Sequence, residues 1–107
     1  MKKKRLKQVE SEIEKVRRKL DRIGRMRPGS LTVQYRDPEK KIGPFHQISY
    51  TNHGKSRTEY VRPPFLKDIR NQINQYKKFR GLIERWVDLS IERSKLEIEI
   101  AKEETER

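Results

Sequence analysis

An apolar residue recurs at every third or fourth position near the N-terminus, and this spacing limits the fold more than any other feature. The series comprises Leu6, Val9, Ile13, Val16, Leu20 and Ile23. Alternating intervals of three and four are typical of a coiled-coil seam, which covers only a narrow strip of the helix surface. The sequence therefore predicts a helix over residues 3–24 that Gly24 ends and that needs a partner helix.

The partner is predicted in the C-terminal part of the chain, because residues after Pro64 contain no proline and only one glycine. One long helix over residues 64–104 is expected there. Its second half carries six seam positions of its own, namely Leu82, Trp86, Leu89, Arg93, Leu96 and Ile100. Antiparallel pairing would place Leu20 near Trp86 and Leu6 near Ile100, and would bring Arg93 within reach of Glu10 or Glu14. Basic residues at the start of the first helix would then meet acidic residues at the end of the second.

Residues 30–62, between the two helices, show the alternation of half-buried strands. Leu31, Val33 and Tyr35 alternate with polar residues, and Asn52-His53-Gly54 can take the positive φ angles of a tight hairpin. The predicted fold class is therefore α+β. A three-stranded antiparallel sheet is inserted between two long helices that form an antiparallel coiled-coil hairpin, and residues 1–107 make a single domain.

Charge narrows the range of partners. The chain has 107 residues, of which 41% are charged and 31% apolar, and its formal net charge is +12. Such an excess attracts polyanions such as nucleic acid or an anionic membrane surface. No apolar run approaches the length of a membrane span or of a signal-peptide core, so we expect a cytoplasmic protein that does not use a membrane.

Residues with catalytic or metal-binding chemistry are sparse. Cysteine is absent, and the two histidines, His46 and His53, have no acidic residue between them. No glycine-rich phosphate loop and no helical His-Glu motif occurs in the sequence. We therefore predict no catalytic residues, no metal site and no cofactor, and a protein that is not an enzyme.

The sheet region favours nucleic-acid binding. Residues 25–80 hold 13 Lys and Arg against four Asp and Glu, a net charge of +9. If the apolar strand residues and Tyr60 face a helix, the opposite face of the sheet is polar and basic, which suits phosphates and base edges. The predicted nucleic-acid-binding residues are Arg25, Arg27, Gln34, Arg36, Lys40, Lys41, Gln47, Ser49, Lys55 and Arg57. Duplex DNA is expected over RNA, because a short β-ribbon fits the major groove.

Two other interpretations remain open. Any antiparallel sheet with one solvated face shows Thr, Ser and Gln there, with or without a ligand. The alternative function is a coiled-coil assembly or adaptor protein that binds a protein partner. Apolar residues outside the predicted seam favour a homodimer; they are Ile83, Val87, Ile91 and Ile98.

The sheet region also resembles a known group of sequences. Its motifs are Gly29-Ser30-Leu31, Gly43-Pro44-Phe45, Gly54-Lys55 with Tyr60-Val61, and INQYKKF at residues 73–79. These resemble a family of small uncharacterised prokaryotic proteins often encoded near transposases, over about residues 29–80. The resemblance implies an accessory or regulatory role for a mobile element. Many members carry a cysteine cluster between the first two strands, which residues 37–42 lack here, so a zinc site is not carried over.

Overall fold

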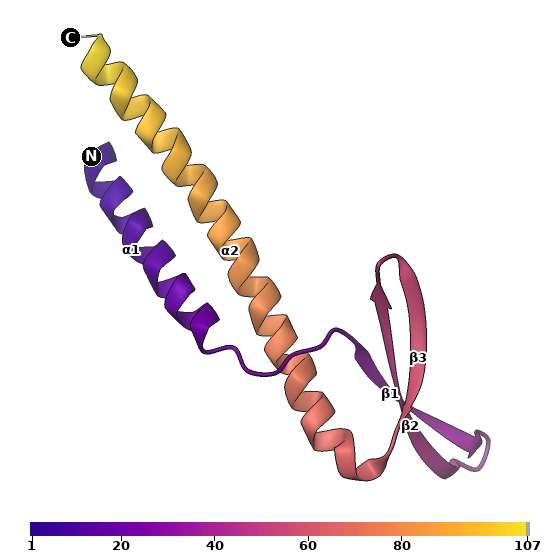
Figure 1. The fold of residues 1–107 in the computed structure, drawn as a ribbon. Helices are drawn as coiled ribbons and strands as arrows, with labels where there is room; N and C mark the ends of the chain where they lie inside the picture. The colour runs from indigo at the N-terminus through magenta and orange to yellow at the C-terminus, as the bar shows by residue number, and fades with distance from the viewer. Residues whose placement is uncertain (107) are drawn as a thin grey trace. The chain divides into compact units, whose positions relative to one another are not determined.

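The computed structural model describes residues 1–106 and confirms the predicted α+β class (Figure 1). The elements follow in the order α1 (Lys2–Asp21), β1 (Ser30–Asp37), β2 (Ile42–Asn52), β3 (Lys55–Val61), a short 3₁₀ turn (Pro63–Phe65) and α2 (Leu66–Thr105). Residues 1–23 and 78–106 form one compact unit, and residues 24–77 form another. The prediction of a single domain stays a prediction. Within residues 1–106, no helix has the length and apolar character needed to span a bilayer.

In the first unit, α1 and the C-terminal part of α2 run side by side in opposite directions, as predicted (Figure 1). Val9, Ile13, Val16 and Leu89 are buried between them. Partly buried side chains pack around this core; they are Leu20, Leu82, Trp86 and Leu96. The hairpin core is thus built from the two predicted stripes, and it supplies the burial that either helix alone would lack.

Ion pairs at the open end of the hairpin agree with the predicted charge pattern. Lys2 contacts Glu99, at 3.5 Å, and Glu103, while Lys3 Nζ lies 3.2 Å from Glu104. These side chains are largely exposed, so each pair adds little stability. Their main contribution is to favour the antiparallel orientation over the parallel one.

The predicted contact of Arg93 across the hairpin is wrong, while Val16 and Leu89 share one core cluster as predicted. On one flank of the hairpin Arg85 contacts Glu12 and Arg5 contacts Glu92. Arg93 does not reach Glu10 or Glu14 but pairs with Glu97 on its own helix, at 3.5 Å.

The predicted end of the first helix also needs correction. Helix α1 ends at Asp21, and the residue that caps it, Arg22, keeps right-handed helical angles. Gly24 therefore lies outside the helix and has no positive φ. Its N–H donates instead to Gln75 Oε1 at 3.0 Å, so the chain leaves the helix without the left-handed glycine cap.

The contact between Arg5 and Glu92 links a small part of the hairpin stability to pH. Arg5 Nε and Nη2 donate to the two carboxylate oxygens of Glu92 at 2.6 and 2.8 Å, and these bonds lower the Glu92 pKa below its ordinary 4.5. A carboxylate with a lowered pKa in the folded state stabilises the fold above its unfolded pKa, and this contribution is lost as the pH falls through the folded pKa. We expect Glu92→Gln to lower the thermal midpoint slightly at pH 7, and the difference from wild type to shrink at about pH 3. Thermal unfolding followed by circular dichroism at both pH values measures this; a difference that is the same at both would contradict it.

In the second unit, β2 lies between β1 and β3, and both pairings are antiparallel. Asn52 pairs with Lys55, so the β2–β3 turn contains only His53 and Gly54, with φ angles of 52° and 74°. Positive φ at both turn positions is typical of the type I′ hairpin, whose twist matches that of the strands. The predicted tight hairpin at Asn52-His53-Gly54 is confirmed. Pro44 is accommodated in the middle strand because β3 pairs with β2 only from His46 onward.

One face of the sheet packs on the first turns of α2. Ile48, Val61 and Ile73 are buried together, and Leu31, Leu66 and Ile69 pack around them. We call this side of the sheet the inner face. The predicted stripe at the start of α2 therefore covers the sheet through Leu66, Ile69 and Ile73.

Candidate nucleic-acid interface

The side of the sheet opposite α2 is a polar surface that we call the outer face. Strand pairing defines it, because residues directly opposite each other in neighbouring strands point to the same side. Leu31, Ile48 and Val61 each mark the inner face in one strand. Side chains alternate between the two faces along a strand, so the residues an odd number of positions away from these three belong to the outer face. In the three strands these are Ser30, Thr32, Gln34, Arg36, Phe45, Gln47, Ser49, Thr51, Ser56, Thr58 and Tyr60.

This arrangement corrects the predicted placement of three β3 residues. Glu59, not Tyr60, lies opposite the buried Ile48, and Tyr60 lies opposite Gln47. Tyr60 therefore belongs to the outer face, whereas Lys55 and Arg57 share the inner face with Tyr50. The outer face is consequently less basic than predicted, and it presents mainly hydroxyl, amide and aromatic groups.

Hydroxyl groups form rows across the outer face. Ser49 Oγ and Thr58 Oγ1 are 3.1 Å apart, and Thr51 Oγ1 and Ser56 Oγ are 3.0 Å apart. All four residues are exposed. Each hydroxyl has one donor and two acceptor positions, so a single cross-strand bond leaves every pair able to bond a ligand. The rows fix the side-chain positions and retain capacity for recognition.

An aromatic pair lies beside the predicted amide Gln47. The ring centroids of Phe45 and Tyr60 are 6.4 Å apart with a tilt of 48° between the planes. Tyr60 is 58% exposed although it sits in a strand of the sheet. An exposed ring on a sheet surface can stack against an unpaired base. These two residues were missed as site candidates, although their alternation with Gln47 and with Thr58 would have placed them on the polar face.

The cations of the predicted site are divided among three places. Arg36 lies at the outer face beside Gly43, where its Cβ, Cγ and Cδ would come within 3.1–3.2 Å of a Cβ on the glycine. Lys40 and Lys41 are exposed in the β1–β2 turn, and Lys41 adopts a φ of 53°. The Lys40 N–H donates to Asp37 Oδ1 at 3.3 Å and closes this turn. These three cations thus lie at one end of the β1–β2 hairpin.

The remaining cations lie elsewhere. Arg27 sits over the ring of Tyr50, with 5.0 Å from its Cζ to the ring centroid, and its Nη2 is 3.7 Å from Glu59 Oε2. Tyr50 in turn donates to Glu59 Oε1 at 2.6 Å, and this bond raises the Tyr50 pKa. Arg27 therefore has an internal role in holding the connector onto the inner face, where Arg57 pairs with Tyr50 across the strands. Arg25 is exposed in the connector.

The structure thus brings part of the predicted site together. Gln34, Gln47 and Ser49 share the outer face with Arg36, and Lys40 and Lys41 lie in the adjoining turn. Arg27, Lys55 and Arg57 lie on the inner face or pack against it. Within residues 1–106, no group of three or more His, Cys, Asp or Glu side chains is placed to hold a metal ion.

Comparisons with protein-family models, curated proteins and solved structures found no match. The resemblance of residues 29–80 to a family encoded near transposases therefore stays a prediction.

Proposed function

We propose that this protein binds nucleic acid through the outer face of its sheet, without catalysis, and that duplex DNA is its partner. The observation that carries the proposal is the exposed polar outer face on a chain with a net charge of +12. Exposure to solvent alone explains a polar sheet face but does not explain a high positive net charge. Binding to a polyanion explains the polar face and the positive charge together.

Within this proposal, the parts of the surface have different roles. The β2–β3 hairpin, closed by a two-residue turn, is a narrow ribbon of the kind that fits the major groove. Gln34 and Gln47 carry amides that can bond adenine at two positions. Arg36, Lys40 and Lys41 would contact phosphates next to the groove, which positions the protein without reading sequence.

A second candidate partner is single-stranded nucleic acid. The exposed Tyr60 beside Phe45 favours it, because base stacking on an aromatic ring contributes about 1–3 kcal/mol and tolerates any base. Paired bases in a duplex are not free to stack in this way. A preference for single strands would thus assign recognition to the aromatic pair, and a preference for duplexes would assign it to the amides and hydroxyls.

Fluorescence anisotropy titrations in a salt series test the proposal. The probes are a labelled DNA duplex, the matching single strand and a structured RNA. We expect binding to the duplex at about 50 mM salt, with three to five phosphate contacts that give a log–log slope of about −3 to −4.5. The absence of binding to all three probes at about 50 mM salt would contradict the proposal.

An accessory or regulatory role for a mobile element, and a cytoplasmic location, belong to the same proposal. The first is supported only by the sequence resemblance, and the second is the expectation from the sequence.

A further inference from the structure

Beside its seam with α1, helix α2 has a second stripe of aliphatic and small residues. This outer stripe follows intervals of four, four, three, four and three, and consists of Ile83, Val87, Ile91, Ser94, Ile98 and Ala101. Val87, Ile91 and Ile98 are 52%, 51% and 54% exposed. At 1.5 Å per residue the stripe is about 27 Å long. Exposed aliphatic residues repeating at helical spacing over this length mark an interaction surface.

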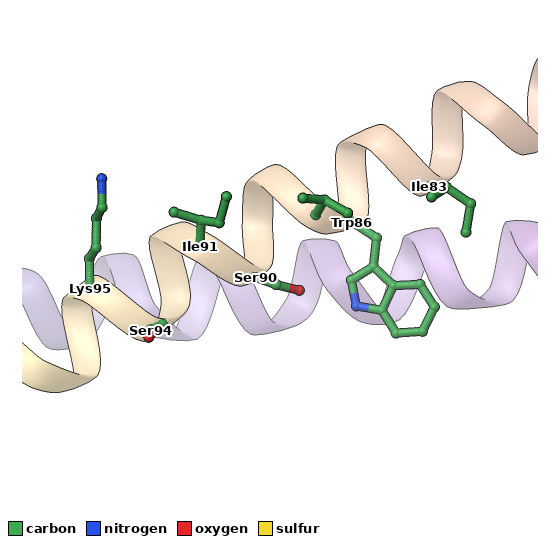
Figure 2. Close-up of a pocket in the computed structure, with 7 residues that line it drawn as sticks. Ile83, Trp86, Ser90, Ile91, Ser94 and Lys95 are labelled. Atoms are coloured by element: carbon green, nitrogen blue, oxygen red, sulfur yellow. The ribbon is translucent and has the colours of Figure 1, made fainter.

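The outer stripe is separate from the hairpin core. Leu82, Leu89 and Leu96 pack toward α1, whereas Ile83, Val87 and Ile91 line an open groove together with Trp86, Ser90, Ser94 and Lys95. Trp86 also packs against the hairpin core, so it forms the border between the core and the groove. Figure 2 shows Ile91 and Lys95 projecting from the side of α2 away from α1. The apolar stripe of α1 cannot cover this groove, since Val9, Ile13 and Val16 are already buried in the hairpin.

A row of charges along one flank of the outer stripe indicates what covers it. Glu84, Asp88, Lys95 and Lys102 follow one another at intervals of four, seven and seven, so they lie on the same side of α2. The two acidic residues come first and the two basic residues last. Among residues 1–106, no ion pair or side-chain hydrogen bond forms at Asp88, Lys95 or Lys102, and Glu84 has only a 4.0 Å contact with Arg80.

The charges beside α1 differ in this respect. Glu92 bonds Arg5, Glu12 bonds Arg85, and Lys2 bonds two glutamates, so the flanks of the hairpin seam have their partners within the chain. The acidic and basic halves of the outer row lack such partners. The acidic half of the row on one helix can lie opposite the basic half on a second helix only if the two helices run in opposite directions.

We propose that two copies of this chain pair their α2 helices antiparallel along the outer stripe. In an antiparallel pair, the charged flank of one helix faces the same flank of the other helix, which runs in the opposite direction. Glu84 and Asp88 of one copy therefore lie against Lys95 and Lys102 of the other. A parallel pair would set each row against the opposite flank, where Trp86 and Ser90 offer no charge to Glu84 or Asp88. Glu97 and Glu104, which share that flank, already pair with Arg93 and Lys3 of their own chain. Ser94 and Ala101, being small, let the two helices approach closely. This dimer is independent of nucleic-acid binding.

Sedimentation velocity of the full chain at about 5–200 μM tests the pairing. We expect the wild-type chain to form a dimer that dissociates on dilution. Ile91→Asp places a carboxylate in the outer stripe and should raise the dissociation constant of the dimer at least about tenfold. Ser11→Asp, on an exposed position of α1, adds the same charge as a control and should leave the dimer unchanged. Far-ultraviolet circular dichroism confirms that both variants stay helical. A wild-type chain that is monomeric throughout, with the stripe left to an unlike protein, would overturn the proposal, as would equal effects of the two variants.

Charge reversal tests the orientation. Asp88→Lys and Lys95→Glu each set like charges opposite one another twice in an antiparallel dimer, so each variant alone should dimerise about three- to tenfold more weakly. Mixing the two restores attraction at both contacts, because residue 88 of one copy faces residue 95 of the other. We expect the mixture to form a heterodimer at least as tight as wild type. A mixture that associates no better than the separate variants would overturn the antiparallel pairing.

Discussion

Replacing Leu89 with alanine is expected to destabilise the helical hairpin by about 2–5 kcal/mol, the cost of deleting a fully buried leucine. Leu89 is 1% exposed and packs in one cluster with Val9, which is 0% exposed. A hairpin of two helices has no other layer of side chains that could close the cavity. The loss is therefore expected in the upper part of this range and comparable with the whole stability of a small domain.

Urea unfolding followed by the helical circular dichroism signal measures this effect. Ile42→Ala serves as a control, because it removes an aliphatic side chain that is 58% exposed and should change the free energy of unfolding by less than about 0.5 kcal/mol. Equal losses for the two variants would contradict the assignment of the hairpin core.

Gly29→Ala is the second substitution with a large expected effect. Gly29 has a φ of 148°, and a Cβ added there would lie 2.7 Å from Ile48 Cγ1 and 3.3 Å from the Ser49 carbonyl oxygen. Ile48 is 1% exposed and cannot move away without disturbing the core of the sheet unit. Backbone strain alone costs about 1–3 kcal/mol, and the overlap with Ile48 adds to it.

Gly81→Ala provides the matched control for this prediction. Gly81 lies within α2, and a Cβ added there would point into open space, with no atom within 4 Å beyond its chain neighbours and the local helix backbone. Alanine is favoured over glycine in a helix interior by about 0.5–1 kcal/mol, so this variant should be stabilised. The two substitutions are chemically identical and should change the urea midpoint in opposite directions. If Gly29→Ala left the urea midpoint unchanged, the backbone before β1 would be free to adjust, and the prediction would be contradicted.

The sequence was sufficient to predict the elements because their signals are local. The a/d spacing from Leu6 to Ile23 requires a helix with a partner, and the alternation from Leu31 to Tyr35 requires a half-buried strand. Both patterns follow from the geometry of a few consecutive residues. The structure confirms both helices and all three strands, with bounds that differ by up to three residues.

How the elements join was harder to predict. The side of the sheet that β3 residues occupy depends on the number of residues in the β2–β3 turn, and a change of one residue moves every side chain to the other face. The two-residue turn His53-Gly54 sets Tyr60 opposite Gln47, which moves it to the polar face. The partner of Arg93 was mispredicted for a related reason, since a long side chain on a repetitive seam has several carboxylates within its reach.

The candidate site shows the same division between local and long-range information. Alternation within each strand correctly grouped Gln34 with Arg36 and Gln47 with Ser49. Composition located the cations near the sheet but could not say which of them the fold would use internally, as it does Arg27 through Tyr50 and Glu59. The revised outer face is a hydroxyl, amide and aromatic surface with cations at its margin.

A comparison of Gln47→Glu with Asn52→Asp tests the role of the outer face most directly. Each replaces an amide by a carboxylate of nearly the same shape and adds one negative charge on β2, but Gln47 points to the outer face and Asn52 to the other side. In duplex DNA titrations we predict that Gln47→Glu weakens binding at least about tenfold, or 1.4 kcal/mol, and that Asn52→Asp weakens it less than about threefold. Equal weakening by the two variants would show that binding is diffuse attraction to the basic chain and would contradict recognition by the outer face.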